Sequence, residues 1–237
     1  MTRRIAEALP ALLEAENAKL RACRYPLCLL HTLDGRNCAA WIDFIKKYNQ
    51  QRESPDAPPG SPGCPVAGEP CSVALPRKIA FVVGLAPSDD CSDLLCVAYV
   101  TITIESNGKL MATLDSCTLI EEEGRGLNKL LRTIVYHLLV TQLNCPLLYS
   151  YTSNRASSHI LRKHFGWTEP PDERVPERIA FATDGDLAEL VGDYSSVHTA
   201  AYEALVGMYQ RMCTIVKAPR GDASSSRPPT RRRLQGE

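Results

Sequence analysis

The residues with the clearest chemical meaning lie between positions 118 and 139, where three carboxylates run into Gly124-Arg125-Gly126 and a helical pattern follows. A strand, a glycine-containing turn and a helix N-terminus together form an anion site, because main-chain N–H groups and the helix dipole point at the ligand. Leucine, isoleucine and valine recur at i, i+3, i+4 and i+7 and predict a helix over 127–143. The turn therefore predicts a site for a phosphate-like anion.

The elements after this turn complete a crossover unit. Residues 145–152 read as a short buried strand, and residues 153–165 read as a helix that begins with a Ser-Asn capping pair. Strand, helix, strand and helix in this order, from 110 to 165, require a parallel strand pair with a right-handed crossover.

The elements before the turn read as helices and then as an antiparallel meander. Helices are expected over 2–22, interrupted by Pro10, and over 38–53, with Trp41, Ile42, Ile45 and Tyr48 on one side. Residues 78–85, 94–106 and 109–121 are rich in β-branched residues and predict strands. The Asn-Gly pair at 107–108 predicts a hairpin between the last two.

The remaining segments are assigned from composition. Residues 54–70 hold six prolines and three glycines and predict a loop or linker. Residues 71–192 are expected to form the core, with a candidate edge strand at 177–183. An additional helix is expected over 193–216, and a disordered basic tail over 217–237.

Two local motifs resemble those of the GNAT superfamily of acyl-CoA-dependent N-acyltransferases. The first is the family's pyrophosphate loop, Gln/Arg-x-x-Gly-x-Gly/Ala, which reads Glu-Gly-Arg-Gly-Leu-Asn over 123–128. The second is Asn-x-x-Ala/Ser, which reads Asn-Arg-Ala-Ser over 154–157 and is followed by a lysine and Gly166-Trp167. The resemblance covers residues 78 to 168. Glu123 and Asn128 depart from the family pattern.

This resemblance implies an α/β (α+β) fold. It has a GNAT-like mixed central sheet, an antiparallel N-terminal meander, a parallel strand pair splayed at the acyl-CoA site and flanking helices. Acetyl-CoA would be the cosubstrate and an unidentified amine the acceptor. The main-chain groups of Thr118 and Ile120 would hold the thioester arm. The pyrophosphate would lie on the loop and the following helix start, at Glu123, Gly124, Arg125, Gly126, Leu127, Asn128 and Lys129.

The second motif would contribute Asn154 and Ser157 to the cofactor site. Asn154 would bond the pantetheine or order the helix, and a plain N-cap explains it equally well. Many family members place a tyrosine acid seven residues after this asparagine, where this chain has Leu161. Tyr149 and Tyr151 are the candidate substitutes. His159 and His164 suit proton transfer by type, but they read as surface or boundary residues.

Asp115 is the first candidate for a general base, because a carboxylate within a central strand is costly unless it is paired or functional. It could also face solvent or pair with a cation. Glu121 and Glu122 come next, as an acidic mouth for a cationic amine or as a solvated loop. Two readings therefore remain: an active N-acetyltransferase, and a catalytically degenerate GNAT-fold binding module. A Rossmann-type dinucleotide site is discounted, because the third glycine is missing.

Bulk composition excludes several other classes. The formal net charge is zero, so no general nucleic-acid or membrane binding is expected. Ten cysteines include no Cys-x-x-Cys pair, so no metal site is expected and reduced thiols indicate an intracellular, cytoplasmic protein. No run of about 18 apolar residues occurs. The arginines at 231–233 leave a nuclear location open.

Overall fold

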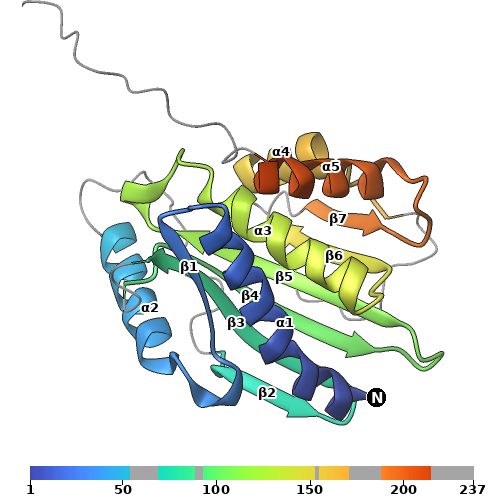
Figure 1. Ribbon diagram of the computed structural model, residues 1–237, viewed down its shortest axis with the longest axis horizontal. Helices are drawn as coiled ribbons and strands as arrows, with labels where there is room; N and C mark the ends of the chain where they lie inside the picture. Colours follow the sequence, from blue (N-terminus) through green and yellow to red (C-terminus); the bar gives the residue numbers. More distant parts are fainter. Residues whose placement is uncertain (54–68, 89–92, 153–154, 171–187, 215–237) are drawn as a thin grey trace, which may run out of the picture.

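The described part of the chain is built around one seven-stranded mixed sheet in the order β1-β3-β4-β5-β6-β7, with β2 paired to β3 beside β1 (Figure 1). This computed structural model describes residues 1–53, 69–88, 93–152, 155–170 and 188–214. The predicted segments 177–183 and 217–237, and most of 54–70, lie outside the described residues.

The predicted meander is confirmed. Strands β3 (Lys78–Pro87), β4 (Cys96–Ile104) and β5 (Leu110–Thr118) pair in antiparallel fashion, each with the next. The Asn-Gly hairpin joins β4 to β5, with Ile104 opposite Leu110 and Gly108 at φ +82°. A positive φ costs a glycine little, and this is why the turn carries one.

The predicted parallel pair is also present, and it is short. β5 pairs with β6 (Leu147–Thr152) only over residues 111–113 and 147–149. Beyond this point, among the strands described, β6 pairs with β7 (Ala188–Asp193) alone. The two parallel strands therefore separate toward their carboxyl ends, and the predicted fold class is confirmed.

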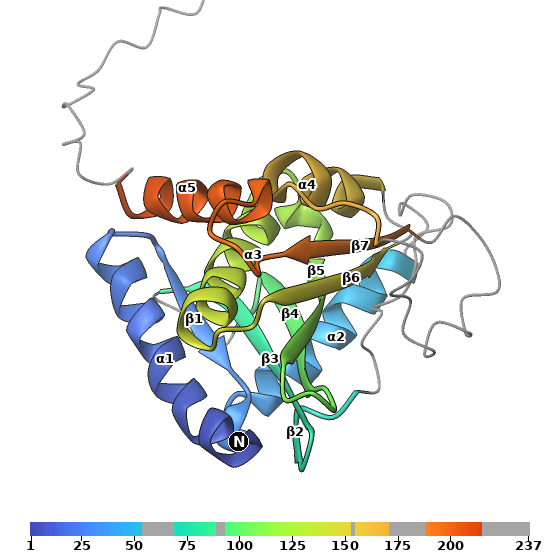
Figure 2. The same cartoon turned by 90° about the vertical axis from the view of Figure 1, so that its right-hand side faces the viewer.

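Helices cover both faces of the sheet (Figure 2). The larger apolar cluster takes side chains from α1 (Thr2–Ala22), α3 (Leu127–His137), α4 (Arg155–Phe165) and α5 (Ala200–Thr214). The smaller cluster takes side chains from α2 (Cys38–Glu53) and the other sheet face. Alternate residues of β4 enter the two clusters, Ala98 the first and Tyr99 the second, as strand periodicity requires.

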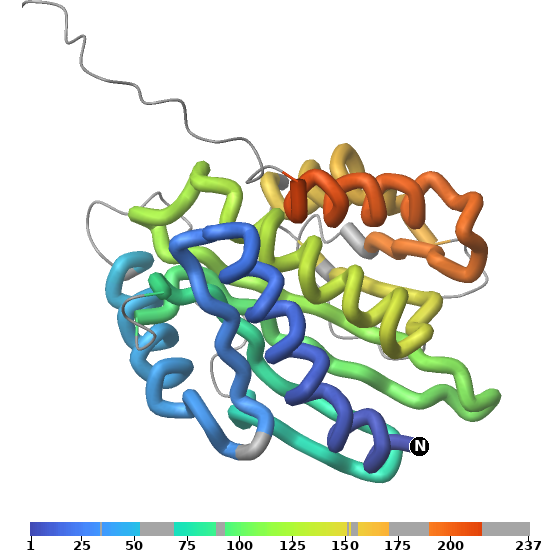
Figure 3. Tube along the Cα trace, in the orientation of Figure 1, coloured from blue at the N-terminus to red at the C-terminus, as the bar shows by residue number. Residues whose placement is uncertain are grey.

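Several short elements were not predicted from sequence. These are β1 (Leu27–His31), β2 (Ser72–Leu75), β7 and two 3-10 turns, at Leu33–Gly35 and at Ile120–Glu122. β1 pairs antiparallel with the second half of β3, and β2 with its first half. The tube in Figure 3 follows the chain from α1 through β1 into α2.

Four sequence predictions were wrong in detail. The helix α1 is continuous through Pro10. Ile42 is 46% exposed, and Phe44 occupies the buried face with Trp41 and Tyr48. The last helix begins at Ala200, because the residues up to Asp193 belong to β7. The helix after the glycine turn ends at His137 and continues as a π-helical turn over Leu138–Gln142.

Among the described residues, no helix is both long enough and apolar enough to cross a membrane.

Candidate functional site

A groove with a volume of about 400 Å³ opens where β5 and β6 separate. Its wall includes the end of β5 (Ser116, Cys117, Thr118), the glycine turn and the start of α3. The other wall comes from α4, through Ala156, Ser157, Ile160 and His164, and from α2, through Tyr48 and Arg52. Both sequence motifs thus border the same groove, although about 30 residues separate them in the chain.

The glycine turn presents a helix start without a side-chain cap. Gly126 is the N-cap residue of α3, with φ +77° and ψ 10°, and no described side chain caps it. An added Cβ there would meet no atom within 4 Å, so the glycine is required by its left-handed backbone and not by crowding. The first N–H groups of a helix have no intrahelical acceptors, and the first residues of α3, Leu127 to Lys129, line the groove, where an anion could accept from them.

Glu123, the first departure from the family pattern, is paired with a residue that sequence reasoning missed. The Arg52 Nη2 atom lies 2.5 Å from the Glu123 Oε1 atom, and Arg52 is mostly buried at the end of α2. The Arg52 guanidinium also lies over the Tyr48 ring, 5.1 Å from its centroid. The negative charge of Glu123 is therefore countered beside the groove. No sequence signal marks this pairing, because 71 residues separate the partners.

The other two carboxylates of this segment are also engaged. Glu121 accepts a hydrogen bond from Gln51 and forms an ion pair with Lys47, with 3.1 Å between the Lys47 Nζ and Glu121 Oε1 atoms. Glu122 forms an ion pair with Arg125. The end of α2 is thus fastened to the chain between β5 and α3.

Two predicted main-chain donors are used elsewhere. Ile120 lies in the 3-10 turn after β5, and its N–H donates to the Gln51 Oε1 atom at 2.9 Å. The Glu123 N–H donates to the Ile120 carbonyl at 3.1 Å. The Ile120 N–H is therefore engaged by the end of α2, and the Glu123 N–H by the tight turn; the roles predicted for these residues toward the thioester arm and the pyrophosphate stay predictions.

Asn128, the second departure, joins α3 to β5. Its Nδ2 atom donates to the Ser116 hydroxyl at 2.9 Å, and its Oδ1 atom accepts from Arg132 Nε at 2.7 Å. Arg132 is only 2% exposed and donates through Nη1 to the Tyr136 hydroxyl at 2.6 Å. A buried polar chain therefore runs from the groove at Ser116 into the core beneath α3.

The open edge of β5 lies at the inner end of the groove. Thr118 pairs with Cys96 on β4, and on its other side β6 has already turned toward β7. Ser150 Oγ donates to the Leu114 carbonyl at 3.4 Å near the point of separation. Strand β4 pairs with one side of the β5 main chain at Ser116 and Thr118, and among the described strands β6 does not pair with the other side there, where an extended ligand could add along the edge.

The candidate base Asp115 is partly buried on the α2 face of the sheet, opposite Tyr99. Burial raises the pKa of the Asp115 carboxyl, the Arg132 cation lowers it and the Glu69 charge raises it. The Tyr99 hydroxyl donates to Glu69 Oε2 at 3.2 Å. Tyr99 and Glu69 were not identified from sequence, and they give this face a second carboxylate beside Asp115.

The candidate acids differ in how far the structure describes them. Tyr149 is 4% exposed and its Cα pairs with Thr113, so strand alternation places it on the same sheet face as Asp115. Tyr151 pairs with Glu189 on β7, and its side chain lies outside the described part. Leu161 is fully buried in the larger core. Asn154 also lies outside the described residues.

Cations gather where α3 and α4 meet. Lys129 and His164 both line the groove. The pKa of His164 is lowered first by burial and then by the nearby charges of Lys129, Lys163 and His159. Mutual repulsion of this kind is relieved by a bound anion.

Comparisons with known proteins found no matching family model and no matching curated protein. Solved structures of acetyltransferases align with the chain at low identity. A chimera of the Vibrio cholerae spermidine N-acetyltransferase SpeG aligns over 72% of this chain and 97% of its own, at 13% identity and a TM-score of 0.45. A GNAT-family acetyltransferase from Streptococcus pneumoniae aligns over 70% of this chain and 98% of its own, at 13% identity and a TM-score of 0.47. FdhC, a nucleotide-linked sugar GNAT, aligns over 79% of this chain and 95% of its own, at 11% identity and a TM-score of 0.47.

Proposed function

We propose that the protein is an acyl-CoA-dependent N-acyltransferase that transfers an acetyl group from acetyl-CoA to an amine of a protein or small molecule. The observation that carries this proposal is the continuous groove from the uncapped start of α3 to the open edge of β5. An anionic head group and an extended amide-bearing arm are the two ligand features that such a groove suits.

Acetyl-CoA would bind with its pyrophosphate at the first N–H groups of α3. Lys129 adds a positive charge there, and Arg52 offsets the charge of Glu123. The pantetheine arm would then follow the edge of β5 past Ser116 to Thr118, where its amides take the place of a neighbouring strand. Ser157 and Ile160 of α4 would close the other side.

The transfer would be direct. The neutral amine nitrogen attacks the thioester carbonyl carbon, a C–N bond forms, the C–S bond breaks and the thiolate leaves. Asp115 would accept the proton that the ammonium must lose, because burial raises its pKa toward that of a useful base. Tyr149, Tyr151 or water would return a proton to the thiolate, whose ordinary pKa of about 8.5 makes this step undemanding.

A catalytically degenerate binding module is the second candidate. It is favoured by Leu161, which fills the core at the position where the family's usual tyrosine acid would stand. A module of this kind would bind acetyl-CoA without turnover. Formation of free CoA from acetyl-CoA in the presence of an amine panel distinguishes the two candidates.

The first experiment is calorimetric titration of acetyl-CoA into the full chain and into two isosteric variants, Gly126→Asp and Gly126→Asn. Both variants carry the same backbone strain, and only the aspartate adds a negative charge where the pyrophosphate would lie. Gly108→Asp is the matched strain control, because Gly108 also has a positive φ and open space but lies in the β4–β5 turn.

We expect acetyl-CoA to bind to the wild type, to Gly108→Asp and to Gly126→Asn, and to bind much more weakly to Gly126→Asp. A folded wild-type protein that binds no acetyl-CoA would overturn the proposed function. Equal binding by the two Gly126 variants would show that the pyrophosphate does not lie at the start of α3.

A further inference from the structure

A second cavity, with a volume of about 500 Å³, adjoins the groove on the far side of the α3 N-terminus. The two cavities share Gly126, Leu127, Lys129 and His164. They therefore meet at the point where the pyrophosphate would bind. Each has a volume within the range of about 300–1,000 Å³ that is usual for small-molecule sites.

The lining of this second cavity differs from that of the groove. Its charged residues are all basic, namely Arg125, Lys129 and Arg211, with His164 beside them. Among the described residues no aspartate or glutamate lines it, whereas Glu122 and Glu123 line the groove. Lys129 and Arg211 have no carboxylate partner at ion-pair distance in the part of the chain that the structure describes. Tyr25, Met208 and Met212 supply an apolar wall opposite these cations.

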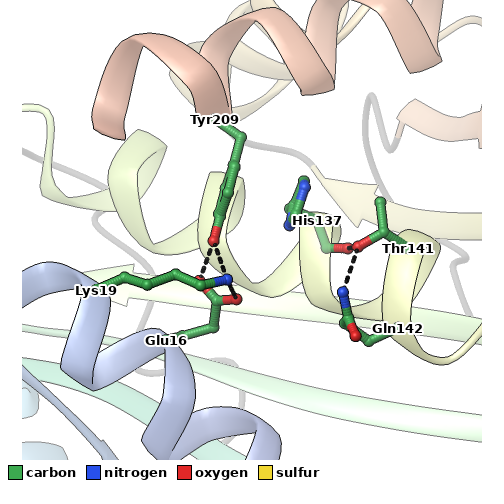
Figure 4. A network of polar contacts seen from close by, with 6 residues as sticks. All are labelled: Glu16, Lys19, His137, Thr141, Gln142 and Tyr209. Carbon is green, nitrogen blue, oxygen red and sulfur yellow. Dashed lines mark hydrogen bonds and ion pairs between the residues drawn. The ribbon is translucent and has the colours of Figure 1, made fainter. Parts of the chain in front are cut away.

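The wall is formed largely by α5 and by the corner between α1 and β1. Figure 4 shows how α5 is held in place. The Tyr209 hydroxyl donates to the buried Glu16 carboxylate at 2.5 Å, and Lys19 Nζ bonds both groups, at 2.7 and 2.8 Å. The His137 ring of α3 stacks on the Tyr209 ring, with centroids 3.4 Å apart.

The end of α5 is fastened to the same corner through its main chain. The Tyr25 hydroxyl donates to the Met212 carbonyl at 3.3 Å, and the Cys23 thiol lies 3.5 Å from the Cys213 carbonyl. These contacts fix the turn of α5 that carries Met208, Arg211 and Met212 above the start of α3. The cavity is therefore built by positioned elements. Of its cations Arg125 is paired with Glu122, whereas Lys129 and Arg211 have no carboxylate at ion-pair distance among the described residues.

We infer that this cavity binds the 3′-phosphorylated adenosine end of acyl-CoA, with Arg211 as a determinant of specificity for the 3′-phosphate. The inference rests on the proposed function, since it extends the same ligand beyond the pyrophosphate. From the shared junction at Gly126 and Lys129, the pantetheine arm enters the groove and the nucleotide enters the second cavity. The phosphate meets the guanidinium of Arg211, and the adenine ring lies against the tyrosine and methionine wall.

The electrostatics of the junction agree with this arrangement. Burial and the charges of Lys129, Lys163 and His159 lower the pKa of His164, and Arg125 and Arg211 line the same cavity. A dianionic phosphate placed among these groups would relieve their repulsion. α5 would thereby acquire a role as one wall of the cofactor site.

The test compares three thioesters on the full chain: acetyl-CoA, acetyl-3′-dephospho-CoA and S-acetylpantetheine. Affinities are measured by calorimetry for the wild type, Arg211→Met and Arg211→Lys. Methionine keeps the length and the apolar stem of the side chain and removes its charge. Arg3→Met is the matched control, because it removes one exposed arginine at the other end of the molecule.

The inference expects wild-type protein to bind acetyl-CoA about 10- to 100-fold more tightly than acetyl-3′-dephospho-CoA, as a charge-assisted hydrogen bond provides. Arg211→Met should bring this ratio of affinities close to one, because it weakens the binding of acetyl-CoA and leaves the binding of acetyl-3′-dephospho-CoA unchanged. Arg211→Lys should keep part of the ratio, and Arg3→Met should keep all of it. An unchanged ratio in folded Arg211→Met, or equal affinities of the wild type for the two nucleotides, overturns the inference and leaves the proposed function standing. Absence of binding to all three thioesters overturns the proposed function itself.

Discussion

Replacing Asn128 by alanine restores a residue that the family's loop pattern allows, and it should nevertheless destabilise this protein. The Asn128 side chain makes two hydrogen bonds, one to the Ser116 hydroxyl at 2.9 Å and one from Arg132 Nε at 2.7 Å. Alanine would leave one donor of a buried guanidinium without its acceptor, and it would release the start of α3 from β5.

The size of the effect follows from these two bonds. The bond to the neutral hydroxyl contributes about 0.5–1.5 kcal/mol, and the bond from the charged guanidinium about 1.5–3 kcal/mol. Alanine returns roughly 0.5 kcal/mol through its higher helix propensity. The expected loss in free energy of unfolding is therefore about 1.5–4 kcal/mol.

Urea denaturation followed by circular dichroism measures this loss, with the m-value checked for constancy. Ser116→Ala is the control for the neutral bond alone and should cost about 1 kcal/mol. The double variant Asn128→Ala/Arg132→Met should cost less than the sum of the two single changes, because the penalty of Asn128→Ala comes from the cation it leaves unsatisfied. A change below about 0.5 kcal/mol for Asn128→Ala, or full additivity, would refute this reasoning.

Three further predictions concern the groove. Arg52→Gln should weaken acetyl-CoA binding in calorimetry by about tenfold, because it uncovers the charge of Glu123, and adding Glu123→Gln should restore most of the affinity. Asp115→Asn should abolish turnover and yet raise the free energy of unfolding at neutral pH. Burial raises the pKa of this carboxyl above its ordinary value of 3.8, so its ionised form destabilises the folded protein. The free energy of unfolding that the variant gains over the wild type should therefore grow as the pH rises through that raised pKa. Bound acetyl-CoA should raise the lowered pKa of His164, so the affinity for acetyl-CoA should increase as the pH falls from about 8 to about 6. An affinity that does not depend on pH would contradict the placement of the anion beside His164. The same holds if His164→Gln leaves the dependence of affinity on pH unchanged.

The parts of the fold that sequence predicted well are those set by local rules. The helix after the glycine turn has apolar residues at helical spacing, and Leu127, Leu131 and Ile134 are buried as expected. The Asn-Gly pair sets the β4–β5 turn through its backbone preference alone. The start of this helix at Leu127 was predicted in the same local way, from the glycine turn and the apolar spacing that follows it.

The parts that were missed depend on contacts between distant segments. β7 reads Ala-Glu-Leu-Val-Gly-Asp, which carries neither a clear alternation nor a turn signal, and it becomes a strand because β6 offers an unpaired edge. Pro10 stays within α1 although local preference opposes it, and Leu9 and Leu13 on either side of it are fully buried. Arg52 could not be assigned to the site, because its partner lies on another element.

The two departures from the family pattern bear most directly on whether the site has been retained. Each of them is held by a specific partner: Glu123 by Arg52 of α2, and Asn128 by Ser116 of β5 and by Arg132. A loop that had lost its ligand would have no need for a mostly buried cation beside its glutamate, since an exposed carboxylate is stable in water by itself. The same loop still ends in a left-handed glycine and a helix start that no described side chain caps, so the first N–H groups of α3 remain available to an anion. Compensation at both positions therefore favours a retained anion site over a decayed one, and the Arg52→Gln and Glu123→Gln pair tests that conclusion: a decayed site would show no change in acetyl-CoA affinity with either substitution.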